Sequence, residues 1–184
     1  MKTARPAPRV PFQGQVQIYM GNGKGKTTAA LGLALRAAGS GLRTYIGQFC
    51  KGQKYGELEA VKRLAPLVTI EQFGRKTFMH IKDPADPADV RMARRGLARS
   101  RAAMISGRYD IVVLDEILIA LFFHLLTEDM VLALMDERPP AVELVLTGRY
   151  APASIIRRAG LVTEMKERKH YYAKGVEARA GIEK

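Results

Sequence analysis

Several residue types are rare or missing in this chain of 184 residues, which has no tryptophan, one cysteine and three histidines. A single cysteine cannot form an internal disulfide, so we expect a cytoplasmic protein. No apolar run approaches the roughly 20 residues of a membrane-spanning helix, and no membrane association is expected. Repeats and low-complexity tracts are also absent. The remaining composition, 47% hydrophobic and 26% charged, is typical of a globular protein.

Acidic residues are scarce beside basic ones, 18 against 30, which gives a net charge of +12. This surplus predicts an anionic partner, such as a nucleotide, a polycarboxylate substrate, a nucleic acid or an acidic protein. Aromatic residues are not interleaved with the basic clusters at 91–101 and 166–169, which argues against binding of single-stranded nucleic acid. We expect no nucleic-acid partner, and a solvated basic surface is the simplest alternative.

The first 13 residues are basic and rich in proline, and they lack the apolar stretch of a secretory signal. We expect them to form a flexible basic arm. Residues 14–184 have the length of one domain with a sizeable core. The sequence therefore predicts a single folded domain behind this arm.

A glycine-rich loop, residues 21–28 (GNGKGKTT), follows the β-prone segment 16–20 and precedes a helical segment rich in Ala and Leu. It fits the phosphate-loop pattern G-x-x-x-x-G-K-[ST], except that Met20 stands at the first position. Such a loop directs backbone N–H groups and a helix N-terminus at phosphate. Lys26 is predicted to contact phosphate oxygens, and the Thr27 hydroxyl to ligate Mg²⁺. A glycine-rich turn without a ligand is the alternative, and it does not explain this order of strand, loop and helix.

β-prone and helical segments alternate along the rest of the chain. Asp86 is a predicted helix N-cap with Pro87 at the first helical position, and Thr127 is the predicted N-cap of a later helix. This alternation predicts a three-layer α/β/α fold of the phosphate-loop NTPase type with a mainly parallel sheet. The expected strands are 16–20, 43–49, 67–73, 111–114, 142–147 and 161–165; the expected helices are 29–38, 57–64, 87–106, a segment after 127, and 152–159.

Asp115 and Glu116 directly follow the apolar strand 111–114. In parallel sheets ligands bind beyond the carboxyl ends of the strands, so these carboxylates should lie near Thr27. An acidic strand end completes the magnesium site of many phosphate-loop proteins. We therefore predict Thr27, Asp115 and Glu116 as Mg²⁺ ligands. Capping of the next segment is the alternative, and the sequence leaves open which carboxylate reaches the metal directly.

Other candidate residues have ordinary alternatives. Phe73 and Phe78 could be core residues, and Cys50 is more often a small buried hydrophobe than a nucleophile. The three histidines, His80, His124 and His170, lack the spacing of metal ligands. No Ser-His-Asp set is evident in the sequence.

Taken with these motifs, the sequence resembles the ATP:corrinoid adenosyltransferase family over about residues 14–184. The phosphate loop of that family also lacks glycine at its first position, where this chain has Met20. Further similar segments are Gly32 and Arg36 on the helix after the loop, Gln48–Gly52 (QFCKG), Val112–Glu116 (VVLDE), Thr147–Arg149 (TGR), Lys169–His170 and Lys174–Glu183 (KGVEARAGIE).

The resemblance implies that ATP and Mg²⁺ bind at the loop and that a corrinoid, cobalamin or a precursor, is the second substrate. In this family the corrinoid cobalt, reduced to Co(I), attacks the ribose C5′ of ATP, and triphosphate leaves as the adenosyl group moves to cobalt. Lys24, Lys26 and Thr27 are implied to stabilise the departing triphosphate. The implied nucleotide-binding residues are Gly21, Asn22, Gly23, Lys24, Gly25, Lys26, Thr27, Thr28, Arg36, Gly148 and Arg149.

The resemblance also implies that Lys51 contacts a ligand and that the loop from Phe73 to Phe78 lies against the corrinoid, where aromatic residues keep the lower axial ligand off cobalt. This chain aligns Lys76 and Phe78 with the family's two loop aromatics, so Phe78 alone fits that role. A homodimer and an electron-donor protein for cobalt reduction are further implied partners.

Two other functions compete at this point: a basic phosphate-loop ATPase acting on nucleic acid, and a small-molecule kinase. The chain lacks an evident arginine-rich lid, which argues against a kinase. An ATPase would release orthophosphate, whereas an adenosyltransferase would release intact triphosphate.

Overall fold

The computed structural model describes residues 13–76 and 85–184. Apart from Gln13, the predicted N-terminal arm lies outside the described residues, as do Phe78 and His80.

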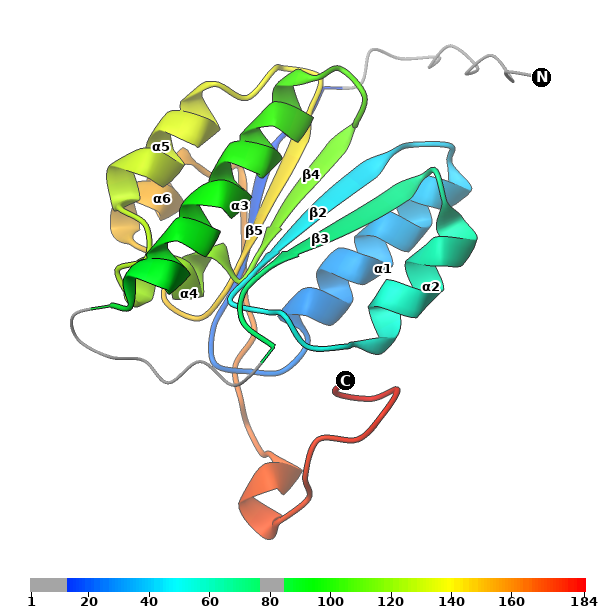
Figure 1. Ribbon diagram of the computed structural model, residues 1–184, viewed down its shortest axis with the longest axis vertical. Helices are drawn as coiled ribbons and strands as arrows, with labels where there is room; N and C mark the ends of the chain where they lie inside the picture. Colours follow the sequence, from blue (N-terminus) through cyan, green and yellow to red (C-terminus); the bar gives the residue numbers. More distant parts are fainter. Residues whose placement is uncertain (1–12, 77–84) are drawn as a thin grey trace.

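A single sheet of parallel strands forms the centre of the described structure, in the order β3-β2-β4-β5-β1-β6 (Figure 1). Every neighbouring pair is parallel, so all carboxyl ends lie along one edge. The predicted fold class is confirmed. The strands are β1 Val16–Met20, β2 Thr44–Phe49, β3 Val68–Phe73, β4 Ile111–Asp115, β5 Glu143–Thr147 and β6 Leu161–Glu164.

Helices cover both faces of the sheet (Figure 1). On one face lie α1 (Lys26–Gly39) and α2 (Gly56–Leu64). The other face carries α3 (Pro87–Ile105), α4 (Ile117–Phe122), α5 (Glu128–Asp136) and α6 (Ala153–Arg158), and a 3₁₀ helix, η1 (Tyr171–Lys174), follows the last strand. None of the helices in the described ranges is both long and apolar enough to cross a membrane.

Two apolar clusters, one on each face, hold the layers together. In β4, Val112 and Leu114 belong to the cluster under α3 to α6, whereas Ile111 and Val113 belong to the cluster under α1 and α2. Successive side chains of a strand point to opposite faces, so a strand covered on both sides is apolar throughout. This explains why the β4 sequence is an unbroken apolar run, which ends in a carboxylate at the carboxyl edge of the sheet.

The element boundaries agree with the sequence prediction to within a few residues, and both predicted N-caps are confirmed. The Asp86 side chain accepts a hydrogen bond from the Ala88 N–H at 2.8 Å, and Thr127 accepts one from Met130 at 3.4 Å. The sequence prediction did not include α4 or η1. Helix α4 has only six residues, ILIALF, which are apolar all round, and its N-cap makes no side-chain hydrogen bond. It therefore has neither the periodicity nor the capping signal of a surface helix.

Two helical glycines make a matched pair for a stability test. A Cβ at Gly96 of α3 would lie 2.8 Å from the ring of Phe73, whereas a Cβ at Gly32 of α1 would meet nothing within 4 Å. We expect Gly32→Ala to raise the free energy of unfolding by about 1 kcal/mol, because alanine favours helix. Gly96→Ala should lower it by about 1 to 2 kcal/mol, because the core is overpacked.

Urea denaturation of the two variants and the wild type measures this difference. A Gly96→Ala variant as stable as Gly32→Ala would show that α3 does not pack on β3 in this way.

Candidate active site

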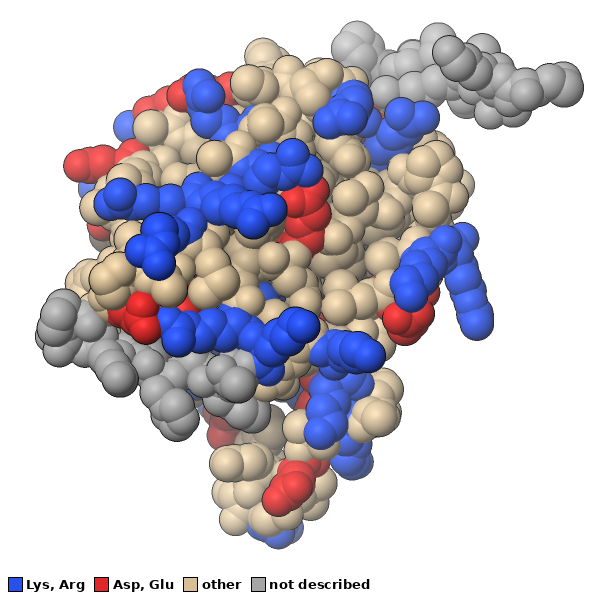
Figure 2. Space-filling model, viewed as in Figure 1, with Lys and Arg blue, Asp and Glu red and all other residues tan. Residues whose placement is uncertain are grey.

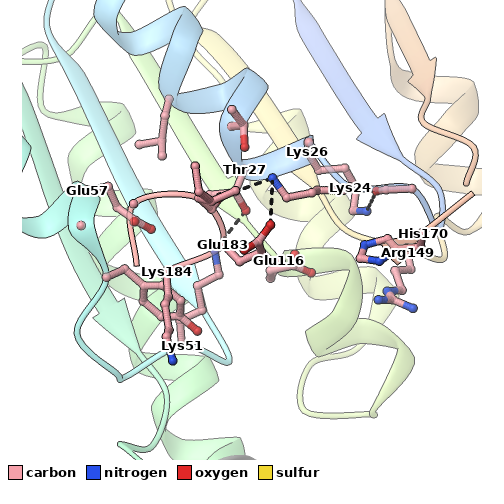
Figure 3. Close-up of a pocket in the computed structure, with 18 of the residues that line it drawn as sticks. Lys24, Lys26, Thr27, Lys51, Glu57, Glu116, Arg149, His170, Glu183 and Lys184 are labelled. Carbon is pink, nitrogen blue, oxygen red and sulfur yellow. Dashed lines mark hydrogen bonds and ion pairs between the residues drawn. The ribbon is translucent and has the colours of Figure 1, made fainter. Parts of the chain in front are cut away.

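A cavity of about 680 Å³ opens at the carboxyl edge of the sheet, over the phosphate loop (Figure 3). Its volume lies in the range of small-molecule sites. The lining residues come from five parts of the chain and are Asn22 to Thr28 and Leu31, Lys51 and Tyr55 to Glu57, Glu116, Arg149, and from the last part Glu167, His170 and Gly181 to Lys184.

The phosphate loop needs glycine for its backbone shape. Gly21 and Gly25 have φ angles of 106° and 119°, which side-chain-bearing residues rarely adopt. A Cβ at Gly21 would also lie 2.4 Å from the carbonyl oxygen of Met165. The Gly23 N–H donates to that same oxygen at 2.7 Å. The loop is therefore braced by the chain that follows β6.

Lys26, at the start of α1, is buried under the loop with 7% of its surface exposed. Its Nζ donates to the carbonyl oxygens of Gly21 and Gly23, each at 2.7 Å. Burial lowers the pKa of Lys26, and the positive charge of Arg149 acts in the same direction. The ammonium group thus sits inside the curve of the loop, next to the first N–H groups of α1, where a phosphate would bind.

Asp115 is fully buried at the tip of β4, and its carboxylate is the centre of a polar network. Oδ1 accepts hydrogen bonds from the Thr27 hydroxyl at 2.9 Å and from the Thr147 hydroxyl at 2.8 Å. Oδ2 accepts from Lys51 Nζ at 2.8 Å and from Gln48 Nε2 at 3.3 Å. We call these five residues the Asp115 network.

Lys51 completes the network from the turn after β2. Besides its ion pair with Asp115, its Nζ donates to the Thr27 hydroxyl at 3.0 Å. Burial alone would lower the pKa of Lys51, but the Asp115 carboxylate outweighs it and raises that pKa. Lys51 therefore neutralises the buried carboxylate and fixes the rotamer of Thr27. The sequence resemblance predicts that Lys51 contacts a ligand, and in the structure Lys51 lines the cavity.

Glu116 lies next to Asp115 in the chain but in a different environment. Its backbone is left-handed, with φ of 62°, and its side chain lines the cavity. Burial raises the pKa of Glu116, and the neighbouring Asp115 charge raises it further. Within residues 13–76 and 85–184, no hydrogen bond or ion pair engages this carboxylate. Asp115 is thus occupied by protein groups, whereas Glu116 is open to a ligand.

The sequence did not assign roles to the polar side chains that support the network. Gln48 Nε2 also donates to Glu57 at 3.0 Å, and Gln72 Nε2 donates to Gln48 Oε1 at 3.0 Å. Thr147 accepts from the Glu116 N–H at 2.9 Å while it donates to Asp115. One sequence feature could have indicated these roles: a polar residue at or near the end of a buried strand, as Gln48 in TYIGQF and Thr147 in ELVLT.

Among the described residues, the predicted site residues that do not line this cavity are Gly21, Arg36, Phe73, Asp115 and Gly148. Arg36 lies in the last turn of α1, ten residues after Lys26 and thus about 15 Å along the helix. Phe73 is buried and packs against Phe49 with ring centroids 6.1 Å apart, which favours the core role that the sequence had left open. Phe78 lies outside the described residues, so its contact with a corrinoid stays a prediction.

The basic surplus is dispersed over the visible face of the molecule, with acidic side chains among the basic ones (Figure 2). Arg99 pairs with Glu71 at 2.6 Å, and Arg101 pairs with Glu137. Part of the positive charge is therefore neutralised within the chain. The active-site edge carries its own concentration of cations, namely Lys24, Lys26, Lys51 and Arg149 (Figure 3).

Comparison with known proteins agrees with this geometry. The model of the family described as ATP:corrinoid adenosyltransferase BtuR/CobO/CobP matches residues 12–183. The corrinoid adenosyltransferase of Pseudomonas aeruginosa is 33% identical over 178 residues, which cover 93% of this chain and 84% of that protein. The corrinoid adenosyltransferase of a Sinorhizobium species is 33% identical over 180 residues, covering 96% and 83%.

The corrinoid adenosyltransferase of Escherichia coli K12 is 29% identical over 181 residues, covering 98% of this chain and 90% of that protein. The family match includes the phosphate loop, the Asp115 network and every cavity residue except Lys184. The chain therefore belongs to the ATP:corrinoid adenosyltransferase family.

Proposed function

We propose that this protein transfers the 5′-deoxyadenosyl group of ATP to the Co(I) centre of a corrinoid and releases triphosphate, in cobalamin biosynthesis or salvage. The observation that carries this proposal is the family match over residues 12–183, which spans nearly the whole cavity. The phosphate loop and the cations around the cavity suit the triphosphate of ATP.

The reaction places few chemical demands on the protein. The Co(I) electron pair forms the bond to ribose C5′, the C5′–oxygen bond breaks, and triphosphate takes that bond's electrons, so no proton has to move. The protein's task is to position the two substrates and to stabilise the charge that develops on triphosphate. Lys24, Lys26 and the N-terminus of α1 face the site where that charge would lie.

Bound Mg²⁺ would neutralise charge on the phosphate oxygens. The residues present fit this ion, because a hydroxyl and a free carboxylate offer the hard oxygen ligands that it prefers. We assign Thr27 and Glu116 as direct ligands. Asp115 already accepts hydrogen bonds on both oxygens, so its role is to orient Thr27.

Cys50 is excluded from this mechanism as a nucleophile. It follows β2 with a left-handed φ of 57°. Burial raises the pKa of its thiol to about 12, so little thiolate exists at neutral pH. Because Co(I) is the nucleophile in the proposed reaction, no protein thiolate is needed.

The remaining expectations are proposals too. They are a homodimer, a cytoplasmic location, an electron-donor protein that supplies Co(I), and a corrinoid held near the loop from Phe73 to Phe78. Because Phe73 is buried, we propose Phe78 as the aromatic contact in that loop.

Lys26→Ala and Thr27→Ala test the phosphate site. Each variant should lose roughly 100-fold in kcat, because one transition-state contact is worth about 3 kcal/mol. Lys62→Ala is the control, since Lys62 is exposed on α2 and pairs with Glu59. The assay follows the adenosylated corrinoid and the phosphate product by chromatography, with and without reduced corrinoid.

Triphosphate that appears only with reduced corrinoid would support the proposed reaction. Orthophosphate release without corrinoid would identify an ATPase instead, and normal turnover of either variant at saturating ATP would remove the role given to that residue.

Asp115→Asn and Glu116→Gln separate the two carboxylates. Asp115→Asn leaves the Lys51 charge without its partner and should lower the free energy of unfolding by about 3 kcal/mol. Glu116→Gln should leave stability unchanged or higher, because it removes an unpaired and partly buried charge, but it should raise the Mg²⁺ concentration for half-activity by at least about tenfold.

Urea denaturation and Mg²⁺ titration of activity measure these effects. Normal stability of Asp115→Asn together with a normal Mg²⁺ response of Glu116→Gln would contradict the division of roles.

Cys50→Ala should keep most of the activity, and iodoacetamide should label Cys50 far more slowly in the native protein than in urea. Mass spectrometry measures the labelling, and the urea sample is the control that the thiol is intact. Loss of turnover in a folded Cys50→Ala variant would show that the thiol takes part in the reaction.

A further inference from the structure

Residues 169–184, which we call the distal segment, extend beyond the sheet and return toward the phosphate loop (Figure 1). Gly181, Ile182, Glu183 and Lys184 line the cavity together with the loop itself. Figure 3 shows Glu183 and Lys184 among the side chains of the site. The phosphate loop, Lys51 and Glu116 form the inner side of the cavity, and the distal segment contributes to its outer side.

Apolar burial does not hold the distal segment in place. Ile182 is 56% exposed and Tyr172 is 72% exposed. The distal segment is instead held by hydrogen bonds that lie outside the apolar core. The position of the segment must therefore depend on a small number of polar contacts.

Those contacts converge on Glu183. Arg179 Nη2 lies 3.2 Å from Glu183 Oε1, and the Arg179 backbone N–H donates to Oε2 at 2.9 Å. The Tyr171 hydroxyl donates to Oε1, and the Arg179 guanidinium lies 4.9 Å from the centre of the Tyr171 ring. The hydrogen bonds from Arg179 and Tyr171 lower the pKa of Glu183 to about 2. The carboxylate thus stays ionised near neutral pH and keeps its partners.

The same cluster fixes the backbone that borders the cavity. The Arg179 carbonyl oxygen accepts hydrogen bonds from the N–H groups of Ile182, Glu183 and Lys184 at 3.2, 3.0 and 3.2 Å. These three hydrogen bonds close a turn over residues 179–184, and the ion pair between Arg179 and Glu183 stabilises it. Because Arg179 neutralises Glu183, this turn adds no net negative charge beside a bound triphosphate.

Among the hydrogen bonds and ion pairs of the described residues, only those of Lys24 join the phosphate loop to the turn. Lys24 Nζ donates to the Ile182 carbonyl oxygen at 3.3 Å and lies 3.9 Å from Glu183 Oε1. Lys24 is partly exposed, with 41% of its side chain accessible. These contacts hold the Lys24 side chain between the phosphate loop and the turn.

We propose that the distal segment is the outer wall of the nucleotide site and that Glu183 is a positioning residue that sets ATP affinity by holding this wall through Arg179 and Tyr171. The inference rests on the proposed ATP site. A wall at this position excludes water from the triphosphate and fixes Lys24, and both effects strengthen the electrostatic contacts of the loop.

Glu183→Ala tests this role, with Glu177→Ala as the matched control. Glu177 is an exposed carboxylate of the same segment and has no hydrogen-bond or ion-pair partner among the described residues. Calorimetry without corrinoid measures ATP binding, and steady-state assays give KM and kcat. In Glu183→Ala the dissociation constant and KM for ATP should rise about fivefold, the size expected for an exposed ionic contact. The fall in kcat at saturating ATP should be smaller than in Lys26→Ala, because only the position of Lys24 is affected, and the melting temperature should stay unchanged.

Limited trypsin digestion is the second readout, because the segment carries cleavage sites at Lys174 and Arg179. ATP should slow cleavage there in the wild type and in Glu177→Ala, but not in Glu183→Ala. ATP affinity and protection equal to wild type in Glu183→Ala would overturn the proposal. A large fall in melting temperature would also overturn it, since Glu183 would then be a residue of the core fold.

These outcomes are separate from those of the proposed function. If ATP protects the segment as expected but no triphosphate appears with reduced corrinoid, the adenosyl transfer is wrong and the wall stands. If transfer proceeds while Glu183→Ala binds ATP normally, only the wall is wrong.

Discussion

The active site depends on the neutralisation of one buried carboxylate. Asp115 is fully inaccessible at the tip of β4, and an unpaired charge in that position would cost several kcal/mol. Each group that offsets this cost comes from a different element: Thr27 from α1, Lys51 from the turn after β2, and Thr147 from β5. The electrostatic demand of a single charge therefore fixes the relative positions of the helix that binds phosphate and the strands around it.

Backbone strain next to this network directs the neighbouring side chains. In a continued strand, Glu116 would point to the opposite face from Asp115. A left-handed φ of 62° ends β4 instead and turns Glu116 into the cavity. Cys50 has the same conformation at the end of β2, and the turn there brings Lys51 back to Asp115. Each such residue costs roughly 1 kcal/mol, and strain of this kind is common at functional sites, where the surrounding structure enforces it.

Local signals explain what could be predicted from the sequence. The apolar strands, the Asp86 and Thr127 caps and the phosphate loop all depend on residues close together in the chain. The roles of Gln48 and Thr147 could not be predicted, because they depend on strand register: Gln48 pairs with Asp115, and Leu146, next to Thr147, pairs with Leu114. The motif assigns Arg36 to the nucleotide site, but the helical rise over the ten residues from Lys26 takes it about 15 Å from the loop.

The two sides of the cavity are held by forces of different kinds. The Asp115 network is buried and shielded from salt, and breaking it would leave a charge without a partner in the interior. The cluster around Glu183 is near the surface, where water and salt readily replace each contact. Local opening takes place where few apolar contacts are lost, which is true of the distal segment and not of the sheet. The buried Asp115 network and the less buried cluster around Glu183 therefore give the two sides of the cavity different local stability.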